Sequence, residues 1–168
     1  MTSGVQSSLD ELRLLIDARS ASTDTLVDAI SNLRHRLDSR LVPLGVETEW
    51  EVVDGAEDLI LGAEATLYVL RIVQEGVSNA VRHGRATRIV SRISHRCLDK
   101  ECANDAKALR GVLSITDNGC GPERASSSSK GNGHGLKSMK LRAAALGGEF
   151  NLQRIDLCTR AELTFTCS

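Results

Sequence analysis

The sequence predicts an α+β fold, a two-layer sandwich of helices packed on one face of a mixed β-sheet. Apolar residues recur at helical or strand spacing in the order helix, strand, helix, strand, strand, helix, strand, strand, after a short N-terminal helix. The 168 residues are enough for one domain, and 41% of them are hydrophobic. Because only 2% are aromatic, the core is expected to be aliphatic.

Residues 5–18 predict the short N-terminal helix. Its apolar residues form one stripe at helical spacing, made of Val5, Leu9, Leu12 and Ile16. A polar linker covers residues 19–23. We therefore separate an N-terminal helix in residues 1–20 from a single domain in residues 21–168.

A second helix and a strand begin this domain. Ser22 or Thr23 is expected to cap the helix, and Pro43 and Gly45 to end it. Its apolar stripe consists of Leu26, Ile30, Leu33 and Leu37. In residues 46–53 apolar and acidic positions alternate, which predicts a half-buried strand before a turn at residues 54–55.

The same two spacings predict the remaining elements. A long helix is expected from Ala63 to His83, with its core face made of Leu70, Val73, Val77 and Ala80. Strands at residues 88–94 and 112–116 are expected to be neighbours, joined by a charged loop around 98–110. After a loop at 117–135, a helix at 136–146 stops at two glycines, and a hairpin of residues 149–155 and 161–167 ends the chain.

Composition argues against several classes of function. A net charge of -1 and scarce aromatic residues argue against a nucleic-acid partner. No apolar run is long enough to span a membrane and no targeting peptide is evident, so we expect no membrane contact by this segment and a cytoplasmic location. The five cysteines include no CxxC pair, which favours a reduced interior. His95, Cys97 and Cys102 lack an apparent fourth ligand, so a metal site there is not favoured.

The long helix carries a first group of candidate site residues. Glu75 and Asn79 are four residues apart and Arg82 follows three later, so their side chains share one helix face. Hard oxygen ligands of this kind suit Mg²⁺, which few protein groups hold together with phosphates. The alternative is an ordinary solvated face of an amphipathic helix.

A second candidate is the segment after the strand at 112–116. Asp117 stands at the strand end, where a carboxylate can accept a hydrogen bond from an exocyclic amine. Gly119 and Gly121 would let the backbone approach a flat ligand closely. The alternative is a plain turn.

The third candidate is the run of alternating glycines at 131, 133 and 135, which leads directly into a predicted helix. Free backbone N–H groups and the helix dipole form an anion site at such a start. The alternative is a flexible connector with a helix cap. Neither the GxxxxGK[ST] phosphate loop nor the dinucleotide GxGxxG pattern matches, which argues against those nucleotide folds.

The three segments together resemble one known family. QEGVSNAVRHG, ITDNGCG and GNGHGLKSMKLRAAALGGEF are similar to the motifs of the catalytic ATP-binding domain of sensor histidine kinases, in the nitrate-sensor and desaturase-regulator class. More widely they resemble the superfamily of DNA gyrase B, Hsp90 and MutL. The resemblance covers roughly Leu9 to the C-terminus, and ELRLLIDA is similar to the end of a dimerisation helix. It implies a Bergerat-type ATP-binding fold with ATP and Mg²⁺ as cofactors.

The resemblance also implies residue roles. Asn79 would bind the Mg²⁺ that bridges the ATP phosphates, and Glu75 would orient or activate the attacking group. Asp117 would accept a hydrogen bond from the adenine amine. The other implied cofactor-binding positions reach phosphate or ribose (Arg82, His83), shape the base pocket (Gly119, Gly121), contact phosphate through backbone (Gly133, His134, Gly135, Leu136) or lie near adenine (Thr159).

The implied activity is transfer of the ATP γ-phosphoryl group to a histidine on a dimerisation domain that this chain lacks, with a response regulator downstream. His35 does not match the acceptor, because Arg36 rather than an acidic residue follows it. Residues 122–132 would form a short ATP lid, disordered without nucleotide. The chain would be a stand-alone protein or the cytoplasmic part of a membrane-bound sensor. The alternatives are an anti-sigma-factor-like serine/threonine kinase, a non-catalytic nucleotide-sensing module and an ATPase clamp.

Overall fold

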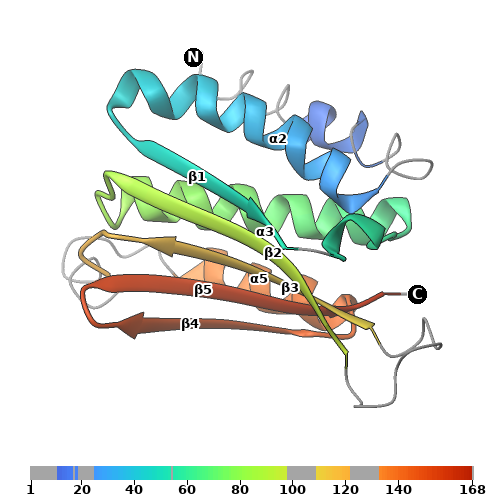
Figure 1. The fold of residues 1–168 in the computed structure, drawn as a ribbon. Coiled ribbons are helices and arrows are strands. Elements are labelled where there is room, and N and C mark those ends of the chain that lie inside the picture. The colour runs from blue at the N-terminus through green and yellow to red at the C-terminus, as the bar shows by residue number, and fades with distance from the viewer. Residues whose placement is uncertain are drawn as a thin grey trace.

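The computed structural model describes residues 11–16, 18, 25–53, 55–97, 109–121 and 133–167. Residues 11–16 and 18 are helical, and the later elements follow the predicted order (Figure 1). The α-helices and strands are α2 (Leu26–Leu41), β1 (Glu47–Val52), α3 (Ala63–Arg82), β2 (Arg88–Cys97), β3 (Leu109–Asp117), α5 (Gly133–Ala145), β4 (Glu149–Ile155) and β5 (Cys158–Thr166). Short 3-10 helices cover Val42–Leu44 and Ala56–Asp58.

The five strands form one mixed sheet in the order β1-β2-β3-β5-β4. β1 and β2 pair in parallel, with α3 as the crossover between them, and all other neighbours pair antiparallel. The helices α2, α3 and α5 cover one face of the sheet (Figure 1). The predicted α+β layer arrangement is therefore confirmed.

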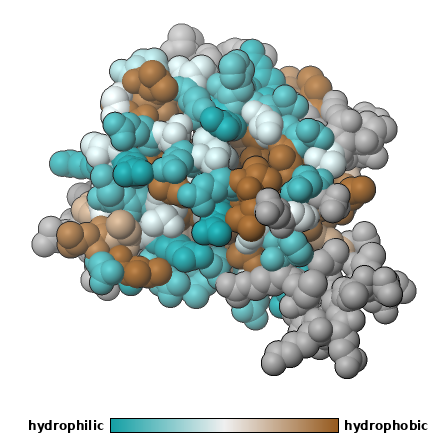
Figure 2. All heavy atoms as spheres, viewed as in Figure 1, coloured by the Kyte–Doolittle hydropathy of each residue, from teal (hydrophilic) through white to brown (hydrophobic). Residues whose placement is uncertain are grey.

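The opposite face of the sheet is largely polar. Figure 2, in the same view as Figure 1, shows hydrophilic side chains over much of the visible surface, with apolar patches between them. Arg88 and Arg92 of β2 pair with Glu49 and Glu51 of β1, at 2.9 and 3.6 Å. Exposed pairs of this kind contribute roughly 0–1 kcal/mol each, so the packed face supplies most of the stability.

α3 forms the centre of the packed layer. Its predicted core residues Leu70, Val73, Val77 and Ala80 are all buried, which confirms the expected face. Burying one such aliphatic side chain contributes about 1.5–3 kcal/mol. The face of the sheet that packs against the helices carries mainly aliphatic residues, together with Phe165, whose side chain is fully buried.

The cap of α2 differs from the prediction. Thr25, rather than Ser22 or Thr23, is the N-cap, and it forms a capping box with Asp28. The Thr25 backbone N–H and hydroxyl both donate to Asp28 Oδ2, and the Asp28 N–H donates to Thr25 Oγ1. The apolar stripe of α2 is buried as predicted, and the helix ends before Pro43.

The predicted N-terminal stripe is not the face of its helix that packs on the domain. Leu14 and Ala18 pack into the core at 3% and 2% exposure, whereas Leu12 and Ile16 are 57% and 64% exposed. Helical spacing identifies an apolar stripe but does not indicate which stripe meets the domain. Val5 and Leu9 lie outside the described residues.

Several element ends differ from prediction because pairing across the sheet extends them. β2 and β3 pair as far as Cys97 and Leu109, beyond the predicted ends. β5 begins at Cys158, three residues early, so the hairpin turn is a two-residue connection in which Asp156 has a φ of 53°. The expected strand at 46–53 is shorter, as β1, and Val52 at this sheet edge is half exposed. The predicted lid at 122–132 and residues 98–108 of the charged loop lie outside the described part of the chain.

Candidate functional site

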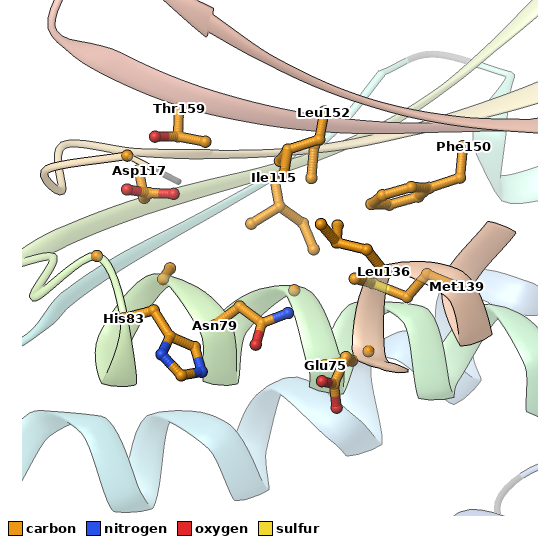
Figure 3. A pocket seen from close by; sticks show the side chains of 16 residues that line it. Glu75, Asn79, His83, Ile115, Asp117, Leu136, Met139, Phe150, Leu152 and Thr159 are labelled. Carbon is orange, nitrogen blue, oxygen red and sulfur yellow. The ribbon is translucent and has the colours of Figure 1, made fainter. Parts of the chain in front are cut away.

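A pocket opens between α3, the end of β3, the start of β5, β4 and the start of α5 (Figure 3). Predicted site residues from segments far apart in sequence line this pocket. The predicted residues among its lining are Glu75, Asn79, His83, Asp117, Gly121, Gly135, Leu136 and Thr159. The pocket therefore unites all three predicted segments.

α3 contributes the polar floor of the pocket. Glu75, Asn79 and His83, spaced by four residues, all line it. Arg82 does not appear among the lining residues and is exposed at the last position of α3. Each residue turns the helix by about 100°, so Arg82 and His83 cannot face the same way. The structure thus brings His83 to the pocket and leaves Arg82 exposed, outside the residues that line it.

Asp117 lies at the end of β3 and is only 8% exposed. Burial raises the pKa of its carboxyl group, while the Gly119 N–H and the positive charge of Arg154 lower it. Gly119 N donates to Asp117 Oδ1 at 2.7 Å. Thr159 of β5 is the register partner of Asp117 and is 6% exposed, so a carboxylate and a hydroxyl stand side by side at this end of the pocket.

The turn after β3 is anchored to the segment that joins α3 to β2 and to the start of β2. Asn118 Oδ1 accepts from the backbone N–H groups of Thr87 and Arg88, both at 2.9 Å. Cys120 N donates to Gly84 O at 2.8 Å. A Cβ on Gly119 would lie 2.5 Å from Gly84 O, so only glycine permits this contact. These contacts position Asp117 relative to α3.

The start of α5 closes the pocket beside Glu75. A Cβ built on Gly135 would lie 2.6 Å from Glu75 Oε1 and 4.0 Å from Asn79 Nδ2. Leu136 lines the same wall. Gly133 is the first residue of α5, earlier than the predicted start at Leu136, and His134 follows it. The surroundings of Gly133 and His134 lie outside the part of the chain that the structure describes.

Sequence reasoning missed the apolar lining of the pocket. A Cβ on Gly76 of α3 would lie 2.7 Å from Ile115 Cδ1, so this glycine lets β3 approach the helix. Other lining residues that were not predicted as part of the site are Ala80, Gly84, Met139, Phe150, Leu152 and Ala161. Gly76 and Gly84 could have been predicted as part of the site, because each is adjacent to a predicted residue in the sequence. The lining residues on the strands could not, because in the sequence they look like ordinary core residues.

The arrangement suits a ligand with a flat polar ring and an anionic tail. Apolar walls with a few convergent polar groups are typical of small-molecule sites. The buried carboxylate of Asp117 is an acceptor for a ring amine. At the other end, Glu75 and Asn79 lie beside the N-terminus of a 13-residue helix, where backbone N–H groups favour anions.

No group of three or more His, Cys, Asp and Glu side chains that could hold a metal ion occurs within the described ranges. The Cys97 side chain and Cys102 lie outside them, so the grouping with His95 is untested. The described helices also include none long and apolar enough to cross a membrane.

Comparison with known proteins agrees with this site. Residues 65–167 match the family of histidine kinase-, DNA gyrase B-, and HSP90-like ATPases. The chain is 29% identical over 145 residues to the methanol utilization control sensor protein MoxY of Paracoccus denitrificans, covering 86% of this chain and 29% of that protein. It is 33% identical over 141 residues to the sensor histidine kinase LnrJ of Bacillus subtilis (strain 168), covering 83% and 30%. The chain thus spans less than a third of the length of these curated relatives.

Solved structures show the same fold. The blue-light activated histidine kinase of Erythrobacter litoralis EL346 superposes with a TM-score of 0.68 at 14% identity, covering 99% of this chain and 49% of that one. The ATP binding domain of PrrB from Mycobacterium tuberculosis gives 0.52 at 20% identity, covering 83% and 94%. The pocket is built from residues within the matched range 65–167, and the chain belongs to the family of histidine kinase-, DNA gyrase B-, and HSP90-like ATPases.

Proposed function

We propose that this domain binds ATP together with Mg²⁺ and transfers the γ-phosphoryl group to a histidine on a dimerisation domain outside these residues. One observation carries the proposal: a single pocket holds the buried Asp117 at one end and Glu75 with Asn79 at the other. Adenine selectivity and phosphate handling need these two ends in one site.

Asp117 is proposed to accept a hydrogen bond from the exocyclic amine of adenine. Guanine presents a carbonyl oxygen at the corresponding position, and two acceptors facing each other repel. Thr159 supports this end with its buried hydroxyl, and Gly121 contributes backbone to the wall. The apolar surfaces of Ile115 and Leu152 provide a dry environment in which one charged hydrogen bond discriminates strongly.

Asn79 fits a Mg²⁺ ion, because its amide oxygen is a hard donor and the residue lines the pocket. Its side chain lies with that of Glu75 near the start of α5 at Gly135. A site with few protein ligands is typical of Mg²⁺ that is shared with nucleotide phosphates. When bound, the ion would neutralise phosphate charge during transfer. The α5 N-terminus, His83 and Arg82 are proposed to add further contacts to the phosphates or the ribose.

For the transfer itself, the acceptor imidazole nitrogen forms a bond to the γ-phosphorus as the bond to the β-phosphate oxygen breaks, and ADP leaves. The proton displaced from the imidazole is proposed to pass to the Glu75 carboxylate, which lines the pocket. Phosphoryl transfer relies on positioning and charge stabilisation, so the domain needs no covalent intermediate.

Residues 1–20 are proposed to be the end of the dimerisation helix, with residues 21–168 as the kinase domain. The exposed Leu12 and Ile16 support this, since they leave an apolar stripe free while Leu14 and Ala18 pack on the domain. A response regulator is proposed as the downstream partner, and the cytoplasm as the location.

The test is incubation of the chain with γ-labelled ATP, Mg²⁺ and a separately produced dimerisation domain. We expect acid-labile label on that domain, and we expect Glu75→Gln to bind ATP but label the domain about 100-fold more slowly. Acid-stable label on a partner protein would favour the serine/threonine kinase instead. ATP binding without any transfer would favour a nucleotide-sensing module, and absence of ATP binding would refute the proposal.

A further inference from the structure

Arg154 of β4 connects the last hairpin to the turn that follows β3. Its Nη1 donates to the carbonyl oxygen of Gly119 at 2.7 Å and to Thr159 Oγ1 at 3.2 Å. The same side chain covers Gly121, where a Cβ would lie 2.6 Å from Nη1 and 3.1 Å from the Arg154 Cδ. One guanidinium therefore contacts three residues around the base end of the pocket.

Arg154 contacts residues that line the pocket but does not line it itself. Gly121 and Thr159 line the cavity, whereas Arg154 is absent from the described lining residues. Gly119 is held at both of its backbone polar groups, because its N–H donates to Asp117 and its carbonyl accepts from Arg154. The position of the Asp117 carboxylate is thus connected to β4 through a single residue.

We infer that Arg154 is a positioning residue of the base pocket, whose guanidinium holds the turn at residues 117–121 against β5 and thereby sets the affinity and selectivity for adenine. This inference rests on the proposed function of Asp117. None of the three sequence motifs includes Arg154, and its partners lie in two other segments, the turn after β3 and the start of β5.

Charge gives the arrangement a measurable signature. Burial raises the pKa of Asp117, and the Arg154 charge opposes this rise. Adenine recognition requires the ionised carboxylate, so binding is lost as the pH falls through the pKa of Asp117. Removing Arg154 raises that pKa further and moves the loss of binding to higher pH. Among the described residues, the other titratable groups that line this pocket are His83 and, at its opposite end, Glu75, and Cys120 lies in the turn after Asp117.

The experiment compares Arg154→Met, which keeps the length but removes charge and donors, with Arg154→Lys, which keeps the charge. Binding of Mg-ADP and Mg-GDP is measured by calorimetry from pH 5.5 to 8.5. We expect Arg154→Met to bind ADP about tenfold more weakly at pH 7.5 and to lose part of its preference for ADP over GDP. We also expect its acid limb, the pH range in which ADP affinity falls as the pH is lowered, to move to higher pH. We expect Arg154→Lys to retain the acid limb of the parent.

Asp117→Asn serves as the control, because any pH dependence that survives it does not come from this carboxylate. Thermal melts of each variant check folding, and a merely structural role would lower the melting temperature without moving the acid limb. Parent-like ADP affinity and pH dependence in Arg154→Met would overturn the inference alone. If the parent chain itself fails to bind ADP, the proposed function fails instead.

Discussion

Replacing Gly119 by alanine tests how the turn positions the site. The new Cβ would lie 2.5 Å from Gly84 O and 2.7 Å from Asp117 Oδ1, and the Gly84 backbone cannot move away cheaply. Overpacking of this kind costs about 1–3 kcal/mol, and loss of glycine entropy in the unfolded chain returns about 0.4–1 kcal/mol. We therefore expect the free energy of unfolding to fall by about 1–2 kcal/mol.

The same change should weaken nucleotide binding. The Cβ crowds the carboxylate oxygen that accepts from Gly119 N, so either this bond or the Cys120–Gly84 bond must lengthen. We expect ADP affinity to drop by about fivefold or more, which corresponds to about 1 kcal/mol. Urea denaturation measures the stability, and calorimetric titration with Mg-ADP measures the affinity.

Gly62→Ala is the matched control. Gly62 also lacks a left-handed φ, but nothing lies within 4 Å of its built Cβ. We expect its stability to stay within about 0.5 kcal/mol of the parent, because a poorer helix cap offsets the gain from the unfolded chain. If Gly119→Ala proves as stable and as tight for ADP as Gly62→Ala, the steric account of the turn is refuted.

Three further predictions concern the metal end, the core and the first helix of the domain. Asn79→Ala should bind ADP without Mg²⁺ much as the parent does but lose the gain that Mg²⁺ adds; titrations with and without the ion decide this, and an unchanged gain contradicts the assignment. Phe165→Ala should lower the free energy of unfolding by about 3–5 kcal/mol in urea melts, because the ring is fully buried against Gly111; a loss below 1 kcal/mol would contradict its place in the core. Thr25→Ala should cost about 1 kcal/mol through loss of the capping box, whereas an unchanged urea midpoint would show that the cap contributes nothing.

The local patterns of the sequence were sufficient for the order of elements and for much of the candidate site. Apolar residues at helical spacing identified the buried face of α3, since burial of that face follows directly from its periodicity. Glu75, Asn79 and Asp117 were selected because each stands in a short motif, and the pocket contains all three. These features depend only on residues that are close in sequence, within one or two helical turns or at the end of a single strand.

Other features were decided by residues distant in sequence. Helical spacing allows either Arg82 or His83 to share a face with Glu75 and Asn79, and the packing of α3 determines that the face with His83 lines the pocket. The buried side of the N-terminal helix depends on contact with the domain, which the pattern of one helix does not contain.

Arg154 had no signal of its own in the sequence, and Gly84 was marked only by its place beside a predicted residue. Their roles arise from hydrogen bonds that cross 35 and 36 residues, from Arg154 to Gly119 and from Cys120 to Gly84. The periodicity of apolar residues indicates which face of each element is buried, and short spacings reveal the motifs. The sequence alone therefore determined the fold class and the motifs. The alignment of Asp117 within the pocket was decided by the tertiary structure, because the groups that hold it meet only when β3, β4 and α3 pack together.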